Sequence, residues 1–145
     1  MYEPAFGNIL TTRAAGIVIP VNTVGVPGKG LAKQAADLVP GWEEDYKASC
    51  DFLEVGSVSL YWLDKSTVFI SLPTKRHWRD PSKLEWIAAG LDATIKACEA
   101  ENIPTIAIPM LGCGCGELNW ADVRALIRER FDKTAVKAYI YGPLT

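Results

Sequence analysis

A cluster of positive charge follows an apolar segment in the middle of the chain. Phe69–Leu72 has the pattern of a buried strand, and Lys75, Arg76, His77 and Arg79 come shortly after it. Like charges this close would favour the neutral form of the lysine amine. A neutral amine can act as a nucleophile or as a general acid or base. The segment therefore predicts a reactive Lys75 at the end of a strand; the alternative is a solvated surface charge.

Two glycine-rich segments could bind an anion, namely Val21–Leu31 and Pro109–Asn119. Each lies between a predicted strand and a predicted helix, where backbone N–H groups can converge on a phosphate. The first segment is not a Walker A loop, because Gly30 stands where that motif has a Ser or Thr to hold magnesium. If both segments lie at one edge of a sheet, they predict a diphosphate held by backbone donors. The alternative is that the glycines only form tight turns.

The cysteines do not indicate a disulfide scaffold or a metal site. Cys50, Cys98, Cys113 and Cys115 are too few for a disulfide-rich domain of this size. With one histidine and one close cysteine pair in the chain, a structural zinc site is not expected. We expect reduced thiols, no metal and no other cofactor. Cys113 and Cys115 would supply backbone amides and small side chains to the second loop rather than thiol chemistry.

Short apolar runs alternate with helical patterns along the chain, which predicts an α/β fold. The predicted strands, rich in β-branched or aromatic residues, are 15–20, 57–62, 67–72, 105–109 and 136–141. The clearest helix begins at Ser82, because Ser82–Glu85 matches a capping box and apolar residues follow at helical spacing. The other predicted helices run from Asn119 to Phe131, from Leu31 to Leu38 and, with a less regular pattern, over 42–52.

The composition is that of an ordinary globular protein. A chain of 145 residues has the length of one domain, so a single domain over 1–145 is expected. No apolar run is long enough to cross a bilayer, and the start MYEPAFGN lacks the features of a signal peptide. These features predict a cytoplasmic protein with no membrane partner. A net charge of −2 argues against a broad nucleic-acid-binding surface but not against a local one.

The order of these motifs resembles that of the macrodomain family across essentially the whole chain. The motifs are Gly7–Ile9, Val21–Thr23, Gly28–Leu31 and Gly112–Gly116. The segment Pro73–Arg79, followed by Ser82–Glu85, is similar to the branch that contains DNA ADP-ribosyl glycohydrolases, the DarG antitoxins. The resemblance implies a three-layer α/β/α sandwich with a central mixed sheet. It also implies ADP-ribose as the ligand.

The resemblance further implies roles for individual residues. Asn8 and Ile9 match positions that recognise adenine, and Asn22 matches the asparagine near the distal ribose. The implied ADP-ribose-binding residues are Asn8, Ile9, Asn22, Thr23, Gly28, Lys29, Gly30, Leu31, Thr74, Gly112, Cys113, Gly114, Cys115, Gly116 and Glu117. The related terminal ADP-ribose glycohydrolase has an acidic residue where this chain has Gly116, with Glu117 one place later. The resemblance therefore assigns no acidic catalytic residue to this chain.

Lys75 and Asn22 are the implied catalytic residues. We hypothesise that Lys75 attacks C1″ of the distal ribose, or serves as general acid or base for opening of that ribose ring. Asn22 would orient the 2″ and 3″ hydroxyls. A protonated lysine would oppose the positive charge that builds up on the sugar, so the hypothesis uses the neutral amine or the ring-opened aldehyde.

The substrate implied by the resemblance is DNA that carries ADP-ribose on thymidine, in single-stranded form. Arg76, His77, Trp78 and Arg79 are candidate DNA contacts, since cations meet phosphates and an aromatic ring stacks on a base. A DarT-like ADP-ribosyltransferase toxin is the implied protein partner. Two alternatives stay open: a hydrolase of ADP-ribosyl glutamate on proteins or of small ADP-ribose esters, and a non-catalytic ADP-ribose-binding module. A binding module needs no lysine at position 75, which favours an enzyme.

Overall fold

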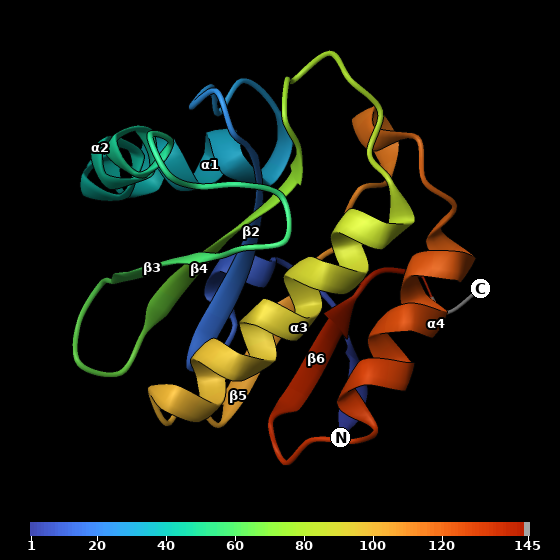
Figure 1. The fold of residues 1–145 in the computed structure, drawn as a ribbon. Helices are drawn as coiled ribbons and strands as arrows, with labels where there is room; N and C mark the ends of the chain where they lie inside the picture. Colours follow the sequence, from blue (N-terminus) through green and yellow to red (C-terminus); the bar gives the residue numbers. More distant parts are fainter. Residues whose placement is uncertain (144–145) are drawn as a thin grey trace.

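The computed structural model describes residues 1–143 and contains one six-stranded sheet (Figure 1). The strands are β1 (Tyr2–Ala5), β2 (Gly16–Asn22), β3 (Ser59–Trp62), β4 (Val68–Lys75), β5 (Thr105–Ile108) and β6 (Lys137–Tyr141). Their order across the sheet is β1-β6-β5-β2-β4-β3. β3 runs antiparallel to β4, and all other neighbours are parallel. The predicted α/β class and the mixed sheet are confirmed.

Four helices cover the sheet: α1 (Gly30–Leu38), α2 (Pro40–Ser49), α3 (Leu84–Ala100) and α4 (Trp120–Phe131). Two short 3-10 helices, Ile9–Thr11 and Gly114–Gly116, lie in loops. α1 and α2 pack on one face of the sheet, and α3 and α4 pack on the other (Figure 1). The predicted three-layer arrangement is therefore confirmed.

The core consists of two apolar clusters, one on each face of the sheet. On β2, Ile17 and Ile19 belong to the cluster with Trp42 and Tyr46 of α2. Val18, between them, belongs to the cluster with α3 and α4. Successive side chains of a strand point to opposite faces, so a central strand covered on both faces must be apolar at every position. This explains the continuous apolar run that predicted β2.

The Ser82 capping box predicted from the sequence is wrong. α3 begins at Leu84, its N-cap residue is Lys83, and no side chain caps it. Ser82 instead donates its backbone N–H to the carbonyl oxygen of Gly116 at 2.9 Å. Its hydroxyl is buried and has no hydrogen-bond partner among the described residues. Ser82 thus makes a tertiary contact with the second glycine loop and does not cap α3.

The helices predicted over 31–38 and 119–131 agree with the structure to within a residue, whereas the helix predicted over 42–52 is observed as α2 at Pro40–Ser49. Asn119 caps α4, because its side-chain oxygen accepts from the N–H of Ala121 at 2.8 Å. α1 ends at Leu38, two residues before the predicted stop at Pro40, and Pro40 is the first residue of α2. The short strand β1 was not predicted; it pairs with β6 at the edge of the sheet. None of the helices within residues 1–143 has the length and apolar character needed to span a bilayer.

Candidate functional site

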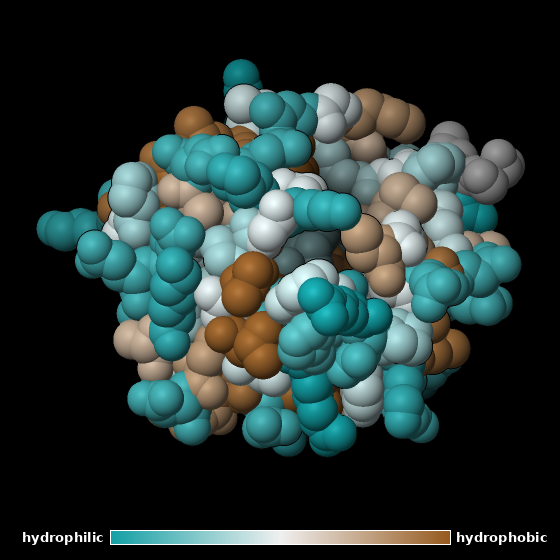
Figure 2. Space-filling model, turned by 90° about the horizontal axis from the view of Figure 1, so that it is seen from above, coloured by the Kyte–Doolittle hydropathy of each residue, from teal (hydrophilic) through white to brown (hydrophobic). Residues whose placement is uncertain are grey.

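The carboxyl edge of the sheet brings together the reactive groups predicted from the sequence. β2 lies between β4 and β5, and all three run in the same direction. The register pairs Asn22 at the end of β2 with Lys75 at the end of β4, across a bulge after Val21. The glycine segments after β2 and β5 therefore leave the same edge next to each other, and Lys75 flanks the first. Figure 2 shows this face from above, with a shaded hollow near its middle.

The side chain of Asn22 organises the backbone hydrogen bonds of the first glycine loop. Asn22 is buried, with 6% exposure. The side-chain oxygen Oδ1 accepts from the backbone N–H groups of Val24, Gly25 and Val26 at 3.2, 3.0 and 3.2 Å. The side-chain nitrogen Nδ2 donates to the carbonyl oxygen of Val26 at 2.9 Å. The amide thus holds the first turn of the loop in place.

Tyr46 of α2 supports Asn22 from below the loop. Its hydroxyl oxygen lies 2.7 Å from the backbone oxygen of Asn22 and 2.9 Å from Oδ1, and it accepts the N–H of Asn22 at 3.3 Å. Burial raises the pKa of the Tyr46 hydroxyl well above its ordinary value, so the group keeps its proton. Sequence reasoning did not single out Tyr46, since nothing in its local pattern points to a partner 24 residues away.

These contacts limit the hydrogen bonds that Asn22 can make to the ribose. Oδ1 is already engaged by three backbone N–H groups and the Tyr46 hydroxyl. Nδ2 has two hydrogens, and one of them goes to Val26. The amide can therefore offer a ribose hydroxyl one N–H donor. Orientation of both the 2″ and 3″ hydroxyls by Asn22 stays a prediction, restricted to that donor.

The end of the first loop is open toward an anion. α1 starts at Gly30 after Lys29, and the N-terminus of the helix has neither a side-chain cap nor an acidic residue in its first turn. Gly30 has a φ of +63°, which favours glycine. Gly28 has no positive φ, and a Cβ there would meet no atom closer than 3.6 Å. Neither backbone strain nor crowding accounts for Gly28, and the space beside it is open.

Packing and backbone conformation both require glycines in the second loop. Gly112 and Gly114 have φ values of +70° and +65°. A Cβ on Gly116 would lie 2.5 Å from the Ser82 hydroxyl oxygen, and one on Gly112 would lie 2.6 Å from Leu118 Cδ1. The loop thus wraps closely around neighbouring side chains. Exposed Glu117 follows with a left-handed φ of 65°.

The thiols of the second loop do not form a disulfide. Among the described residues all four cysteines are free, with Cys113 half-buried and Cys115 exposed. Burial raises the pKa of the Cys113 thiol, which disfavours the reactive thiolate. No group of three His, Cys, Asp or Glu side chains within 1–143 is placed to hold a metal ion.

The end of β4 is tied to the first loop. The backbone N–H and the hydroxyl of Thr23 both donate to the carbonyl oxygen of Arg76, at 3.0 and 3.1 Å. Thr74 is buried, whereas Lys75 is half-buried and accessible from the edge. This arrangement holds Lys75 beside the loop that Asn22 organises.

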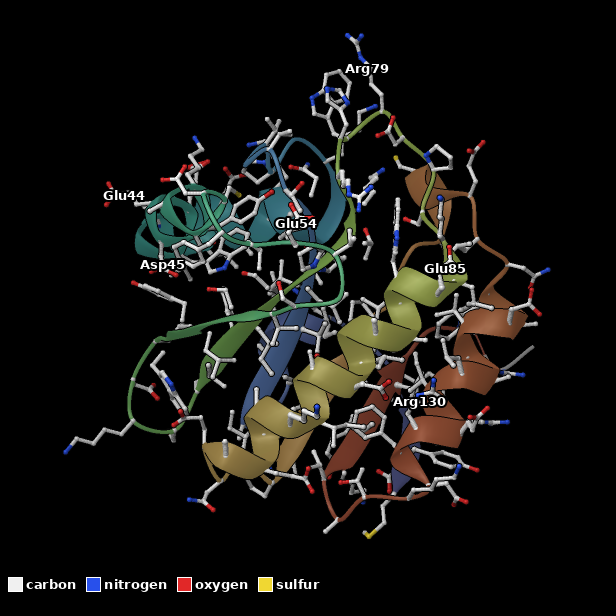
Figure 3. The ribbon with its side chains drawn as sticks, viewed as in Figure 1. Glu44, Asp45, Glu54, Arg79, Glu85 and Arg130 are labelled. Carbon is white, nitrogen blue, oxygen red and sulfur yellow. The ribbon has the colours of Figure 1, made fainter. Side chains whose placement is uncertain are left out.

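The cationic side chains that follow Lys75 in the sequence contact separate partners on the surface. The Arg76 guanidinium lies 3.8 Å from the Glu54 carboxylate and 5.3 Å from the Trp86 ring centre. Arg79 lies 4.4 Å over the Trp78 ring and extends outward from the top of the 76–83 loop (Figure 3). His77 packs against Trp78, with ring centres 5.0 Å apart. Trp78 remains 43% exposed.

The residues expected to recognise adenine reach the same edge from β1. The Asn8 side-chain oxygen caps the short 3-10 helix by accepting from the N–H of Leu10 at 3.0 Å, and Asn8 itself is exposed. Ile9 is buried in the cluster under α1 and α2. β1 runs parallel to its neighbour, so its carboxyl end faces the same way as those of β2 and β4. Asn8 and Ile9 are thus compatible with a ligand that extends along this edge.

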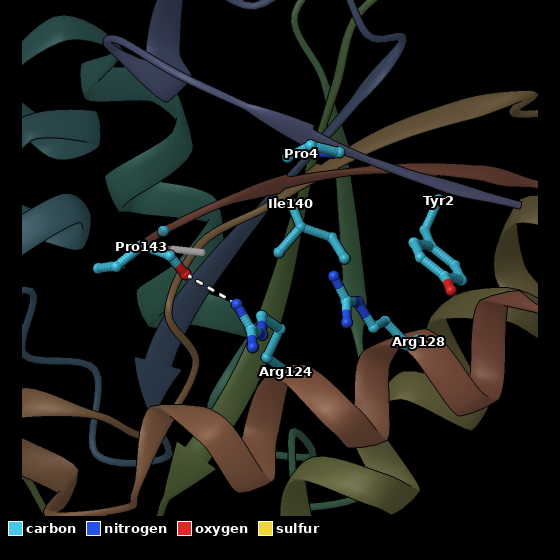
Figure 4. Close-up of a pocket in the computed structure, with 7 residues that line it drawn as sticks. Tyr2, Pro4, Arg124, Arg128, Ile140 and Pro143 are labelled. Atoms are coloured by element: carbon cyan, nitrogen blue, oxygen red, sulfur yellow. Dashed lines mark hydrogen bonds between the residues drawn. The ribbon is translucent and has the colours of Figure 1, made fainter. Parts of the chain in front are cut away.

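A narrow groove shown in Figure 4 is separate from this site. Its lining residues come from β1, from α4, and from β6 and the residues after it: Tyr2, Pro4, Arg124, Arg128, Ile140, Gly142 and Pro143. Within it, Arg124 donates to the carbonyl oxygen of Pro143 at 3.4 Å. The two glycine loops contribute nothing to this groove.

Comparison with known proteins identifies the family. The model of the Macro domain family matches residues 18–127. The DNA ADP-ribosyl glycohydrolase of Mycobacterium tuberculosis is 37% identical over 143 residues, covering 94% of this chain and 41% of that protein. The chain spans about two fifths of the length of the curated relatives that it matches most fully.

Solved structures agree in fold. The macrodomain of M. tuberculosis DarG superposes with a TM-score of 0.93 at 36% identity, covering 99% of this chain and 98% of that one. Thermosipho africanus DarTG in complex with ADP-ribose superposes with a TM-score of 0.88 at 32% identity, covering 97% of this chain and 42% of that one. The matched family model, over more than half of the sequence, shows that this chain belongs to the macrodomain family.

Proposed function

We propose that this chain is an ADP-ribosyl glycohydrolase that removes ADP-ribose from thymidine in DNA. The observation that carries the proposal is the pairing of Lys75 with Asn22 at the edge where two glycine loops emerge. This pairing would set a nucleophilic or acid–base group beside the bound diphosphate. The DNA ADP-ribosyl glycohydrolase named above, together with the DarTG structure that contains ADP-ribose, supports this choice of ligand and reaction.

The diphosphate would bind between the first and second loops. Open backbone at Gly28 and the uncapped N-terminus of α1 supply donors from one side. The second loop supplies backbone N–H groups from the other. Adenine would extend toward Asn8 and Ile9, and the distal ribose toward Lys75. The remaining proposed ligand contacts are Thr23, Lys29, Gly30, Leu31, Thr74, Gly112, Cys113, Gly114, Cys115, Gly116 and Glu117.

The reaction breaks the bond between C1″ of the distal ribose and the thymine nitrogen. Lys75 acts on the anomeric carbon as a nucleophile, or moves a proton on the ribose during ring opening. Asn22 contributes its remaining N–H to a ribose hydroxyl. The thymine nitrogen gains a proton, one water is consumed, and the products are free ADP-ribose and unmodified DNA.

The loop after Lys75 would bind the DNA strand. Exposed Trp78 can stack on a base next to the modified thymidine, and Arg79, already over its ring, can meet a phosphate. Arg76 and His77 flank these two residues. Such contacts require unpaired bases, so the proposed substrate is single-stranded. The ADP-ribose must be added by a DNA ADP-ribosyltransferase, a DarT-like partner, and the DNA substrate and free thiols suit the cytoplasm.

The test is a turnover assay on two substrates in parallel. ADP-ribosylated oligonucleotide and ADP-ribosylated protein are each incubated with the chain and a chelator, and release of ADP-ribose is followed. We expect release from DNA, and a loss of at least about 100-fold in Lys75→Ala, because general acid–base or nucleophilic groups contribute that much or more. Exposed Lys65→Ala, in the β3–β4 turn, is the control and should keep wild-type turnover.

Three results would contradict the proposal. Release from protein alone would favour the hydrolase of ADP-ribosyl glutamate. Binding of ADP-ribose without release from either substrate would favour a binding module. Wild-type turnover in Lys75→Ala would remove the lysine from the mechanism.

A further inference from the structure

We propose that Tyr46 is a positioning residue of this site, which sets the first glycine loop and the distance between Asn22 and Lys75. Its effect on turnover rests on the proposed function. Its effect on the loop does not, because the contacts that carry it lie within the protein. The hydroxyl contacts the backbone N–H, the backbone oxygen and the side-chain oxygen of Asn22, at 3.3, 2.7 and 2.9 Å. Three contacts from one buried hydroxyl fix both the main chain and the side chain of a residue.

Asn22 is the point where β2 needs such support. The pairing of β2 with β4 shifts between Val21 and Asn22, so Asn22 lies opposite Lys75. A bulge disrupts the regular ladder of backbone hydrogen bonds and redirects a side chain. The Tyr46 hydroxyl lies at this irregularity and contacts the backbone groups of Asn22. The bulge that brings Asn22 opposite Lys75 is thus held by a side chain from outside the sheet.

Asn22 in turn holds the backbone of the loop that follows it. The Asn22 side-chain oxygen accepts three successive backbone N–H groups, from Val24 to Val26. If Asn22 rotated, these three donors would lose their common acceptor. The Tyr46 hydroxyl therefore acts on the loop through Asn22.

Tyr46 is linked through Trp42 to β4, the strand that carries Lys75. Its ring stacks on Trp42 with centres 5.3 Å apart and planes at 6°. Trp42 donates its indole N–H to the Ser71 hydroxyl on β4 at 3.0 Å. α2 thus contacts β2 through Tyr46 and β4 through Trp42, and these two strands carry Asn22 and Lys75. One turn of α2 thus contacts both strands that carry the residues assigned to the reaction.

The experiment compares Tyr46→Phe with Ser49→Ala. Tyr46→Phe removes the hydroxyl and keeps the stacked ring. Ser49→Ala is a matched control, because the Ser49 hydroxyl is buried on the same helix and donates to the Tyr46 carbonyl oxygen at 2.7 Å without contacting Asn22. Amide hydrogen exchange of the segment 22–31, the affinity for ADP-ribose and the turnover of ADP-ribosylated oligonucleotide are measured for both.

We expect faster exchange in 22–31 for Tyr46→Phe than for Ser49→Ala. We also expect turnover of Tyr46→Phe to fall about tenfold, the equivalent of one hydrogen bond of ordinary strength. Exchange in 22–31 equal to that of the control would overturn the proposal. If the wild-type chain releases no ADP-ribose, the proposed function fails, and the exchange result still decides the role of Tyr46.

A second variant covers the case in which Tyr46→Phe does not fold. Ser71→Ala removes the acceptor of the Trp42 indole N–H and leaves Tyr46 in place. We expect exchange in 22–31 to increase relative to Ser49→Ala, because α2 loses its polar contact with β4. No increase would overturn the proposal.

Discussion

The contact between Ser82 and Gly116 predicts an unusual pair of stability effects. The Ser82 hydroxyl is buried without a hydrogen-bond partner among the described residues. Leaving a buried polar group unpaired costs about 1–3 kcal/mol. Ser82→Ala removes that cost and loses only a few packing contacts. We therefore expect the free energy of unfolding to rise by about 1 kcal/mol.

The matched substitution Ser49→Ala should have the opposite sign. Ser49 is likewise buried, but its hydroxyl donates to the carbonyl oxygen of Tyr46 at 2.7 Å. Loss of a hydrogen bond of this kind lowers the free energy of unfolding by about 0.5–1.5 kcal/mol. The two serine variants thus separate the effect of an unpaired hydroxyl from that of a paired one.

Gly116→Ala tests the same contact from the other side. The added Cβ would lie 2.5 Å from the Ser82 hydroxyl oxygen and 3.1 Å from Ser82 Cβ. Overpacking of this kind costs about 1–3 kcal/mol. Without the hydroxyl the closer clash disappears, so Gly116→Ala should cost less in the Ser82→Ala background. We expect a coupling free energy of about 1 kcal/mol between the two sites.

Urea denaturation of the wild type, the three single variants and the double variant provides the measurement. The reasoning is refuted if Ser82→Ala lowers the free energy of unfolding as much as Ser49→Ala does. It is also refuted if the effects of Ser82→Ala and Gly116→Ala simply add.

Three further predictions concern other parts of the chain. Gly90→Ala should lower the free energy of unfolding by about 1–3 kcal/mol in urea denaturation, because its Cβ would lie 2.9 Å from Leu72 Cδ2 between α3 and β4. Burial raises the pKa of the Cys98 thiol from 9.0 to about 12. The unfolded chain therefore loses this proton first, so stability should decline from about pH 9 toward pH 12, and Cys98→Ala should reduce that decline. Trp78→Ala should weaken binding of single-stranded oligonucleotide by about 1–3 kcal/mol, and Arg79→Ala should reduce the salt dependence of that binding; unchanged binding in both would contradict the DNA-contact role.

Most of the sheet could be predicted because the central strands are buried on both faces. Continuous apolar runs such as 17–19 and 68–70 have no other simple explanation in a globular chain. β1 was missed because it is a mostly exposed edge strand with the sequence YEPA, which lacks an apolar period. Ser82 was misread because a capping box is a local signal, and the second loop competes for the same residue.

The neighbourhood of the two loops and Lys75 could also be anticipated. Parallel strands end at one edge, so residues that follow them meet there. The support of Asn22 by Tyr46 could not be predicted, because it depends on how α2 packs against β2. The sequence pattern of 42–52 was also irregular. The partners of Arg76 and Arg79 were likewise set by tertiary contacts, with Glu54 and Trp78.

A crystal structure of the chain with ADP-ribose tests the central claim most directly. The account predicts the diphosphate between the 23–30 and 112–117 segments, within hydrogen-bond distance of their backbone N–H groups, and C1″ of the distal ribose next to the Lys75 amine. A nucleotide bound elsewhere, or a distal ribose that points away from Lys75, would contradict it.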